Sequence, residues 1–69
     1  MFGLYRVHFD YYRYEDLVCV SKNTTLLEVK ALELWNVDNR YNVGLIKPSE
    51  EYDNHGEEYF VILPIEELV

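Results

Sequence analysis

The sequence predicts a single α+β domain in which one helix packs on a mostly antiparallel sheet, with its elements in the order β-β-α-β-β. Two observations predict this class. Residues 23–36 form the only long run without Gly or Pro and are rich in residues that favour helix. Short alternating or β-branched apolar runs lie on both sides of that stretch. A chain of 69 residues has room for one core, so we treat 1–69 as a single domain.

The residues before the helix are predicted to form two strands. Residues 2–12 alternate in polarity, as expected for a strand with one buried face. The residues predicted to face the core are Tyr5, Val7 and Phe9. A turn is expected within residues 13–16. The β-branched run at 17–20 then predicts a short strand that is buried on both faces.

The helix is predicted to begin with a capping box and to bury one stripe of its surface. Thr25 and Glu28 have the spacing at which a hydroxyl and a carboxylate each accept from the other's backbone N–H. One stripe should face the sheet: Leu27, Ala31, Leu34 and Trp35. Its expected contacts are Val7, Phe9, Phe60 and Ile62. Val29 and Leu32 lie away from this stripe, so we expect either a homodimer or a partner protein to cover them.

After the helix, the chain is predicted to return twice through the sheet. Residues 42–47 predict a third strand, which Pro48 closes because proline cannot donate to a ladder. Residues 49–56 are polar and acidic and predict a loop. Residues 57–63 are the strongest strand signal in the chain, and Pro64 ends them.

Charge is distributed unevenly along the chain. The formal net charge is −7. Residues 1–47 contain all six Lys and Arg and six of the 13 acidic residues, so the whole excess lies in residues 48–69. Like charges repel, so we expect no direct contact with nucleic acid and instead a partner with a basic surface.

The candidate site is therefore a partner-binding surface in the acidic C-terminal third. Its predicted residues are Glu50, Glu51, Tyr52, Asp53, Glu57, Glu58 and Tyr59. In the sharpest form of this hypothesis, the carboxylates imitate the phosphates of DNA and block a nucleic-acid-binding host protein. Two alternatives remain open. The contact is instead apolar and tyrosine-rich, with the acids serving only solubility, or the chain is a ubiquitin-like adaptor.

Several other functions find little support in the sequence. Cys19 and His8 lack a third group that would orient a nucleophile and its base, so we expect no catalytic residues and no enzyme activity. Residues 53–57 hold two carboxylates and an imidazole, but their spacing matches no known metal signature. We therefore expect no metal and no cofactor. A single cysteine and the absence of a long apolar run predict a cytoplasmic protein without membrane contact.

Two family resemblances add expectations. Residues 21–33 look like the second strand and helix entry of ubiquitin-like proteins, where a Thr cap and a Val-Lys-Ala run occupy similar places. This resemblance implies a β-grasp fold. Residues 67–69 lack the terminal Gly-Gly that ubiquitin-like modifiers and sulfur carriers need, so no conjugation chemistry is expected.

The second resemblance is to small acidic bacteriophage proteins that take over host enzymes, in particular inhibitors of bacterial RNA polymerase. Those proteins have a hairpin, a Thr-Leu-led helix with a Leu-Glu-Leu segment and Trp, and then a strand ending near a proline. The similar residues here are Thr25-Leu26, residues 32–35 and residues 43–48. The resemblance implies a non-enzymatic inhibitor that acts in the host cytoplasm.

Overall fold

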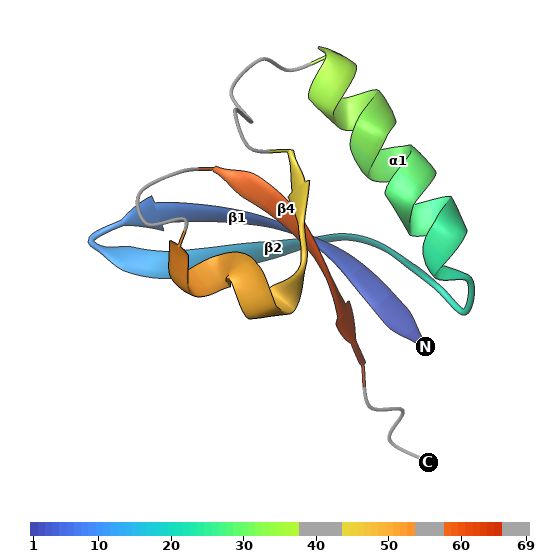
Figure 1. Cartoon of the computed structure of the whole chain (residues 1–69), viewed down its shortest axis with the longest axis horizontal. Coiled ribbons are helices and arrows are strands. Elements are labelled where there is room, and N and C mark those ends of the chain that lie inside the picture. The colour runs from blue at the N-terminus through green and yellow to red at the C-terminus, as the bar shows by residue number, and fades with distance from the viewer. Residues whose placement is uncertain (38–43, 54–57, 66–69) are drawn as a thin grey trace.

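Four strands and one α-helix make up the described part of the chain, in agreement with the predicted α+β class (Figure 1). The computed structural model describes residues 1–37, 44–53 and 58–65, apart from the side chains of Asp10, Tyr52 and Asp53. The elements are β1 (Phe2–Asp10), β2 (Tyr12–Ser21), α1 (Thr24–Val37), β3 (Leu45–Ile46), the 3₁₀ helix η1 (Pro48–Asp53) and β4 (Tyr59–Pro64).

The sheet has the strand order β2-β1-β4-β3. β1 pairs antiparallel with both β2 and β4, whereas β3 runs parallel to β4. The prediction of a mostly antiparallel sheet is confirmed. Residues 42 and 43 of the predicted third strand lie outside the described residues. The first part of the predicted acidic loop forms η1, because Pro48 suits the first position of a helical turn.

Both faces of the two central strands are buried, which the alternating pattern of β1 did not reveal. On the face covered by α1, Leu4 and Phe60 are 0% and 1% exposed and pack in one cluster with the helix. On the opposite face, Val7 and Tyr59 are both 0% exposed. The predicted burial of Val7 is therefore confirmed, but its predicted contact with the helix is wrong.

Phe9 and β2 are more exposed than predicted, because they lie away from the covered centre of the sheet. Phe9 is 36% exposed near the end of β1. β2 is an edge strand, so Leu17 and Val20 of the run predicted to be buried on both faces are 54% and 47% exposed. Leu4 pairs with Cys19 and the next residue pairs with Leu17, so β2 carries a bulge at the skipped position.

The helix begins one residue before the predicted capping box, at Thr24. Asn23 caps it instead, because its Oδ1 accepts a hydrogen bond from the backbone N–H of Thr25 at 2.9 Å. Thr25 already lies inside the first turn, so the prediction of a Thr25–Glu28 box is wrong.

Only the centre of the predicted helix stripe is fully buried. Leu27 and Ala31 are each 1% exposed and pack with Leu4 and Phe60, whereas Leu34 is half-buried at the margin of this cluster. Trp35 is 39% exposed, so its predicted burial is wrong. The helix therefore stabilises the sheet through little more than two turns. No helix in the described ranges is long and apolar enough to cross a membrane.

The β1–β2 hairpin turns at Tyr11, earlier than the predicted turn at residues 13–16. Asp10 pairs with Tyr12 across the turn, which forces Tyr11 into a backbone conformation with φ of 69°. This region is unfavourable for a bulky L-residue. The Tyr11 side chain is 99% exposed, so it gains almost no packing in return.

We therefore expect Tyr11→Gly to raise the free energy of unfolding by about 0.5–1 kcal/mol, because glycine adopts positive φ without strain. Urea denaturation followed by the fluorescence of Trp35 would measure it. The matched control is Tyr12→Gly, which should lower stability because Tyr12 is a strand residue. Equal losses in both variants would show that Tyr11 is not strained.

Candidate functional site

The structure divides the predicted acidic site between two elements. Glu50 and Glu51 lie on η1, while Tyr59 begins β4 and Glu58 directly precedes it. The side chains of Tyr52 and Asp53 and all of Glu57 lie outside the described residues. The described members do not form one exposed surface, because Glu51 and Tyr59 have contacts within the fold.

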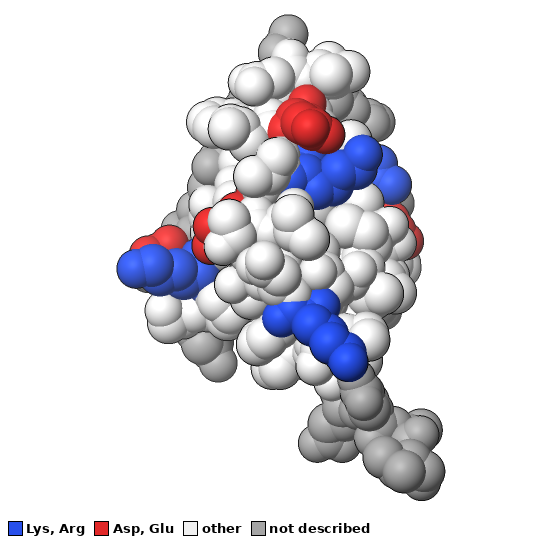
Figure 2. Space-filling model, turned by 90° about the vertical axis from the view of Figure 1, so that its right-hand side faces the viewer, with Lys and Arg blue, Asp and Glu red and all other residues white. Residues whose placement is uncertain are grey.

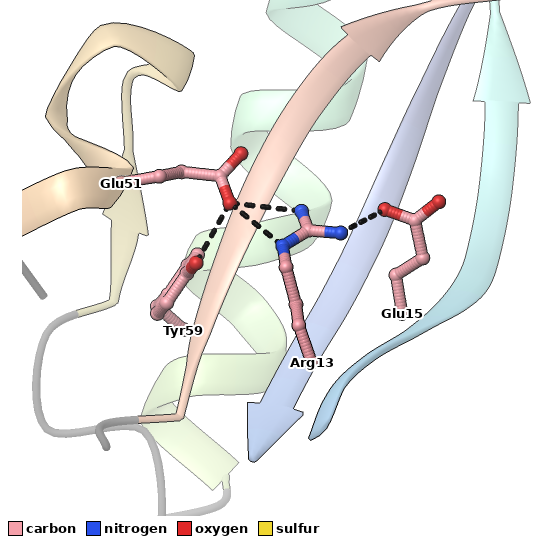
Figure 3. Close-up of polar contacts among 4 residues, drawn as sticks. All are labelled: Arg13, Glu15, Glu51 and Tyr59. Atoms are coloured by element: carbon pink, nitrogen blue, oxygen red, sulfur yellow. Dashed lines mark hydrogen bonds and ion pairs between the residues drawn. The ribbon is translucent and has the colours of Figure 1, made fainter. Parts of the chain in front are cut away.

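Glu51 is the centre of a polar network that joins three elements (Figure 3). Its Oε2 accepts a hydrogen bond from the Tyr59 hydroxyl at 2.8 Å. The same oxygen accepts from Arg13 Nε at 3.0 Å and from Arg13 Nη2 at 2.8 Å. Arg13 Nη1 also donates to Glu15 Oε2 at 2.7 Å. Arg13 on β2 thus links η1 to the sheet through a carboxylate that is 19% exposed.

This environment keeps Tyr59 neutral and Arg13 charged. Burial raises the pKa of Tyr59, and its hydrogen bond to Glu51 raises it further. Burial opposes the charged form of Arg13, but the hydrogen bonds to Glu15 and Glu51 outweigh that effect and raise the pKa of the guanidinium. A neutral phenol donor and a charged guanidinium are the forms that a buried carboxylate can bind most favourably.

Two consequences follow for the predicted site. Tyr59 is 0% exposed, so its side chain cannot contact a partner in this fold. Glu51 joins η1 to β2 and β4, so neutralising this residue would affect the fold as well as the surface charge. Among the described members, Glu50 is exposed and Glu58 is half-buried, so both reach the surface.

A different surface, on α1, is apolar and exposed. Five large apolar side chains of the helix are exposed by between 39% for Trp35 and 86% for Val37. They are Leu26, Val29, Leu32, Trp35 and Val37, and we call them the α1 face. The side of the molecule that carries α1 shows mostly uncharged atoms between separate Lys, Arg, Asp and Glu groups (Figure 2). The sequence had indicated Val29 and Leu32, but Trp35 and Leu26 were missed.

The candidate nucleophile and base, Cys19 and His8, do not lie together in the sheet. Cys19 pairs with Leu4, whereas His8 pairs with Tyr14 and stacks on its ring. Four residues along β1 correspond to roughly 13 Å, too far for a nucleophile and its base. In the described residues, no group of three His, Cys, Asp or Glu side chains is placed to hold a metal ion. Residues 54–57 of the candidate metal loop lie outside the described ranges.

Comparisons of the chain with protein families, with curated proteins and with solved structures find no match. The resemblances to ubiquitin-like proteins and to phage inhibitors therefore stay predictions. Functional inference depends on the chemistry of this chain's own surface.

The network makes a stability prediction for Glu51. We expect Glu51→Ala to lower the free energy of unfolding by about 1–3 kcal/mol, because it leaves the buried Tyr59 hydroxyl without its acceptor. The matched control is Glu33→Ala, since Glu33 is 64% exposed and lies 3.9 Å from Lys30. That control should change stability by less than about 0.5 kcal/mol. Chemical denaturation yielding equal values for both variants would contradict a structural role for Glu51.

The raised pKa of Tyr59 makes a prediction for alkaline pH. The folded state holds the Tyr59 proton more tightly than the unfolded chain, whose tyrosines titrate near pH ~10. This stabilising contribution is complete below pH ~10 and is lost as the pH rises through the pKa of the folded state. Denaturation series at increasing pH should therefore show a steeper loss of stability for the wild type than for Tyr59→Phe. Parallel curves would contradict the prediction.

Proposed function

We propose that this chain is a non-enzymatic binding protein that acts by covering a surface of a partner protein, with the α1 face as its main contact. The observation that carries the proposal is the exposure of five large apolar side chains on one helix. Large apolar side chains exposed together on one element of a small domain are typical of protein–protein contacts. Trp35 is the residue type most enriched among side chains that dominate binding energy.

The free energy expected from burying the α1 face is small compared with the cost of association, so binding needs support from other interactions. Complete burial of one Leu or Val side chain contributes roughly 1.5–3 kcal/mol, and these side chains are already partly covered. Association costs about 4–15 kcal/mol in lost freedom of motion. Electrostatic attraction to the partner, or a further binding site next to the α1 face, would supply the remainder.

A second candidate is binding through the acidic third, which the charge distribution favours. All of the formal net charge of −7 arises from residues 48–69. On the described surface, Glu50 and Glu58 can contact a basic partner, whereas Glu51 is held by Arg13 and Tyr59. In this candidate, carboxylates occupy the nucleic-acid groove of a host protein and block it, as the resemblance to phage inhibitors implies.

Variants of the α1 face test the first candidate. The wild type would be used to capture a partner from a bacterial lysate, and the partner would then be purified for binding measurements. We expect Leu26→Glu with Val29→Glu to weaken binding by at least about tenfold, because both changes place a charge on the apolar contact. The matched control is Leu17→Glu with Val20→Glu on β2, which alters equally exposed apolar residues away from α1.

Salt dependence and neutral variants separate the two candidates. If α1 makes the contact, affinity should vary little between low and moderate salt, and the control pair should bind like the wild type. If the acidic third makes it, affinity should fall steeply with salt and also in Glu50→Gln with Glu58→Gln. Full binding by the α1 variant would refute the first candidate.

A homodimer would be another way to cover the α1 face. A two-fold contact would bring the faces of two copies together, although two chains of charge −7 repel each other. Sedimentation equilibrium of the wild type and of Leu26→Glu with Val29→Glu decides this point. A wild-type dimer that dissociates in the variant would assign the face to self-association rather than to a foreign partner.

A further inference from the structure

A groove runs between α1 and the edge strand β3. At one end is a hollow of about 440 Å³ whose walls include Phe2, Ile46 and Ile62. At the other end is a hollow of about 410 Å³ whose walls include Ala31, Leu32 and Trp35. Glu28 and Leu45 line both hollows, so the two lie next to each other along α1, and we refer to them together as the groove. Figure 1 shows α1 beside the yellow segment that contains β3.

Trp35 is held in position at one wall by the backbone of residue 44. Gly44 has a φ of 73°, and a side-chain Cβ at this position would lie 3.1 Å from the indole ring. Glycine therefore allows both the turn into β3 and the close approach of the ring. With one face of the indole against Gly44 and 39% of the residue exposed, Trp35 offers a preorganised apolar surface to the groove.

Glu28 places a negative charge where the two hollows meet. Its side chain is exposed, and within the described part of the chain its carboxylate makes no hydrogen bond or ion pair. In the hollow of about 440 Å³, Lys47 and Glu50 carry opposite charges. The Glu50 carboxylate accepts a hydrogen bond from the backbone N–H of Lys47 at 3.4 Å. The charge that is left for a ligand near the middle of the groove is therefore negative.

The backbone of β3 can also take part in binding, through hydrogen bonds at the edge of the sheet. Among the residues that the structure describes, β3 is the last strand of the sheet and pairs with β4 alone. The outer side of Leu45 and Ile46 can thus accept an extended chain by strand addition. Two residues give only a short ladder, so most of the affinity must come from side chains that enter the hollows on either side of Glu28.

We propose that this groove binds an extended segment of a partner protein in which a Lys or Arg pairs with Glu28 and bulky apolar residues on either side fill the two hollows. This inference rests on the proposed function and names the kind of segment that the partner presents. A basic segment also agrees with the negative charge of the whole chain, which would attract it before contact. The α1 face is adjacent, because Leu32 and Trp35 belong to both surfaces.

A displayed library of random peptides tests the proposal directly. Peptides selected on the wild type should be enriched in Lys or Arg flanked by bulky apolar residues. Selection on Glu28→Lys should replace the basic residue by Asp or Glu. The matched control is Glu33→Lys, which makes the same charge change on the same helix at a residue outside the groove, and it should select the wild-type motif.

One synthetic peptide selected on the wild type would then be titrated while the emission of Trp35, the only Trp in the chain, is recorded. We expect a saturable change in emission and an affinity that is at least about tenfold weaker for Glu28→Lys than for Glu33→Lys. Circular dichroism of both variants would verify that each remains folded. Leu45→Asp should also weaken binding, because it removes the apolar side chain that lines both hollows.

The outcomes separate this inference from the proposed function. No enriched motif on the wild type, a motif without Lys or Arg, or the same motif on Glu28→Lys would overturn the groove proposal. A wild-type dimer that Leu45→Asp dissociates would also overturn it, by assigning the groove to a second copy. In any of these cases, partner binding that is lost in Leu26→Glu with Val29→Glu would still support a contact at the α1 face. If the groove motif is absent and Leu26→Glu with Val29→Glu also binds the partner like the wild type, both proposals are refuted.

Discussion

The hydrogen bonds to the Glu51 carboxylate are the interaction on which the second half of the core depends. β4 carries apolar side chains on both faces, and a single α-helix can cover only one of them. On the other face, Arg13 and Tyr59 hold η1 against the sheet through Glu51. The network therefore turns a two-layer arrangement into one with cover on both sides (Figure 1). In a chain this short, each layer contributes only a few buried residues. Losing either layer would therefore remove a large part of the free energy of folding.

Because the core is so small, α1 keeps an exposed apolar surface. Leu27 and Ala31 are the helix residues that the sheet buries fully. Leu34 packs at the margin of the core, and the other large apolar side chains of the helix face solvent or the groove beside β3. For an isolated domain this surface increases the risk of association, which the net negative charge opposes. A surface of this kind is consistent with a domain whose most stable state includes a bound partner.

Charge on this molecule has at least two roles that composition alone does not separate. Glu51 is a structural carboxylate with three hydrogen-bond donors. Glu28 is an exposed carboxylate at the junction of two apolar hollows, a position in which a single charge can select a ligand. Both are ordinary glutamates in the sequence. Only their surroundings distinguish the glutamate that stabilises the fold from the one that we propose to bind a basic residue of a partner.

The sequence by itself determined the α+β class, the order of the elements and the burial of Leu27 and Ala31, because periodicity and turn residues are local properties. It also indicated that Val29 and Leu32 would be exposed. Strand order, the Glu51 network and the groove depended on contacts between distant residues, such as Arg13 with Glu51 and Trp35 with Gly44. The burial of Leu4 and Tyr59 and the exposure of Phe9 were likewise decided by which layers cover each face of the sheet. Alternation along a strand separates its two faces but does not say how many of them are covered, and that was decided only when η1 and α1 packed on opposite sides.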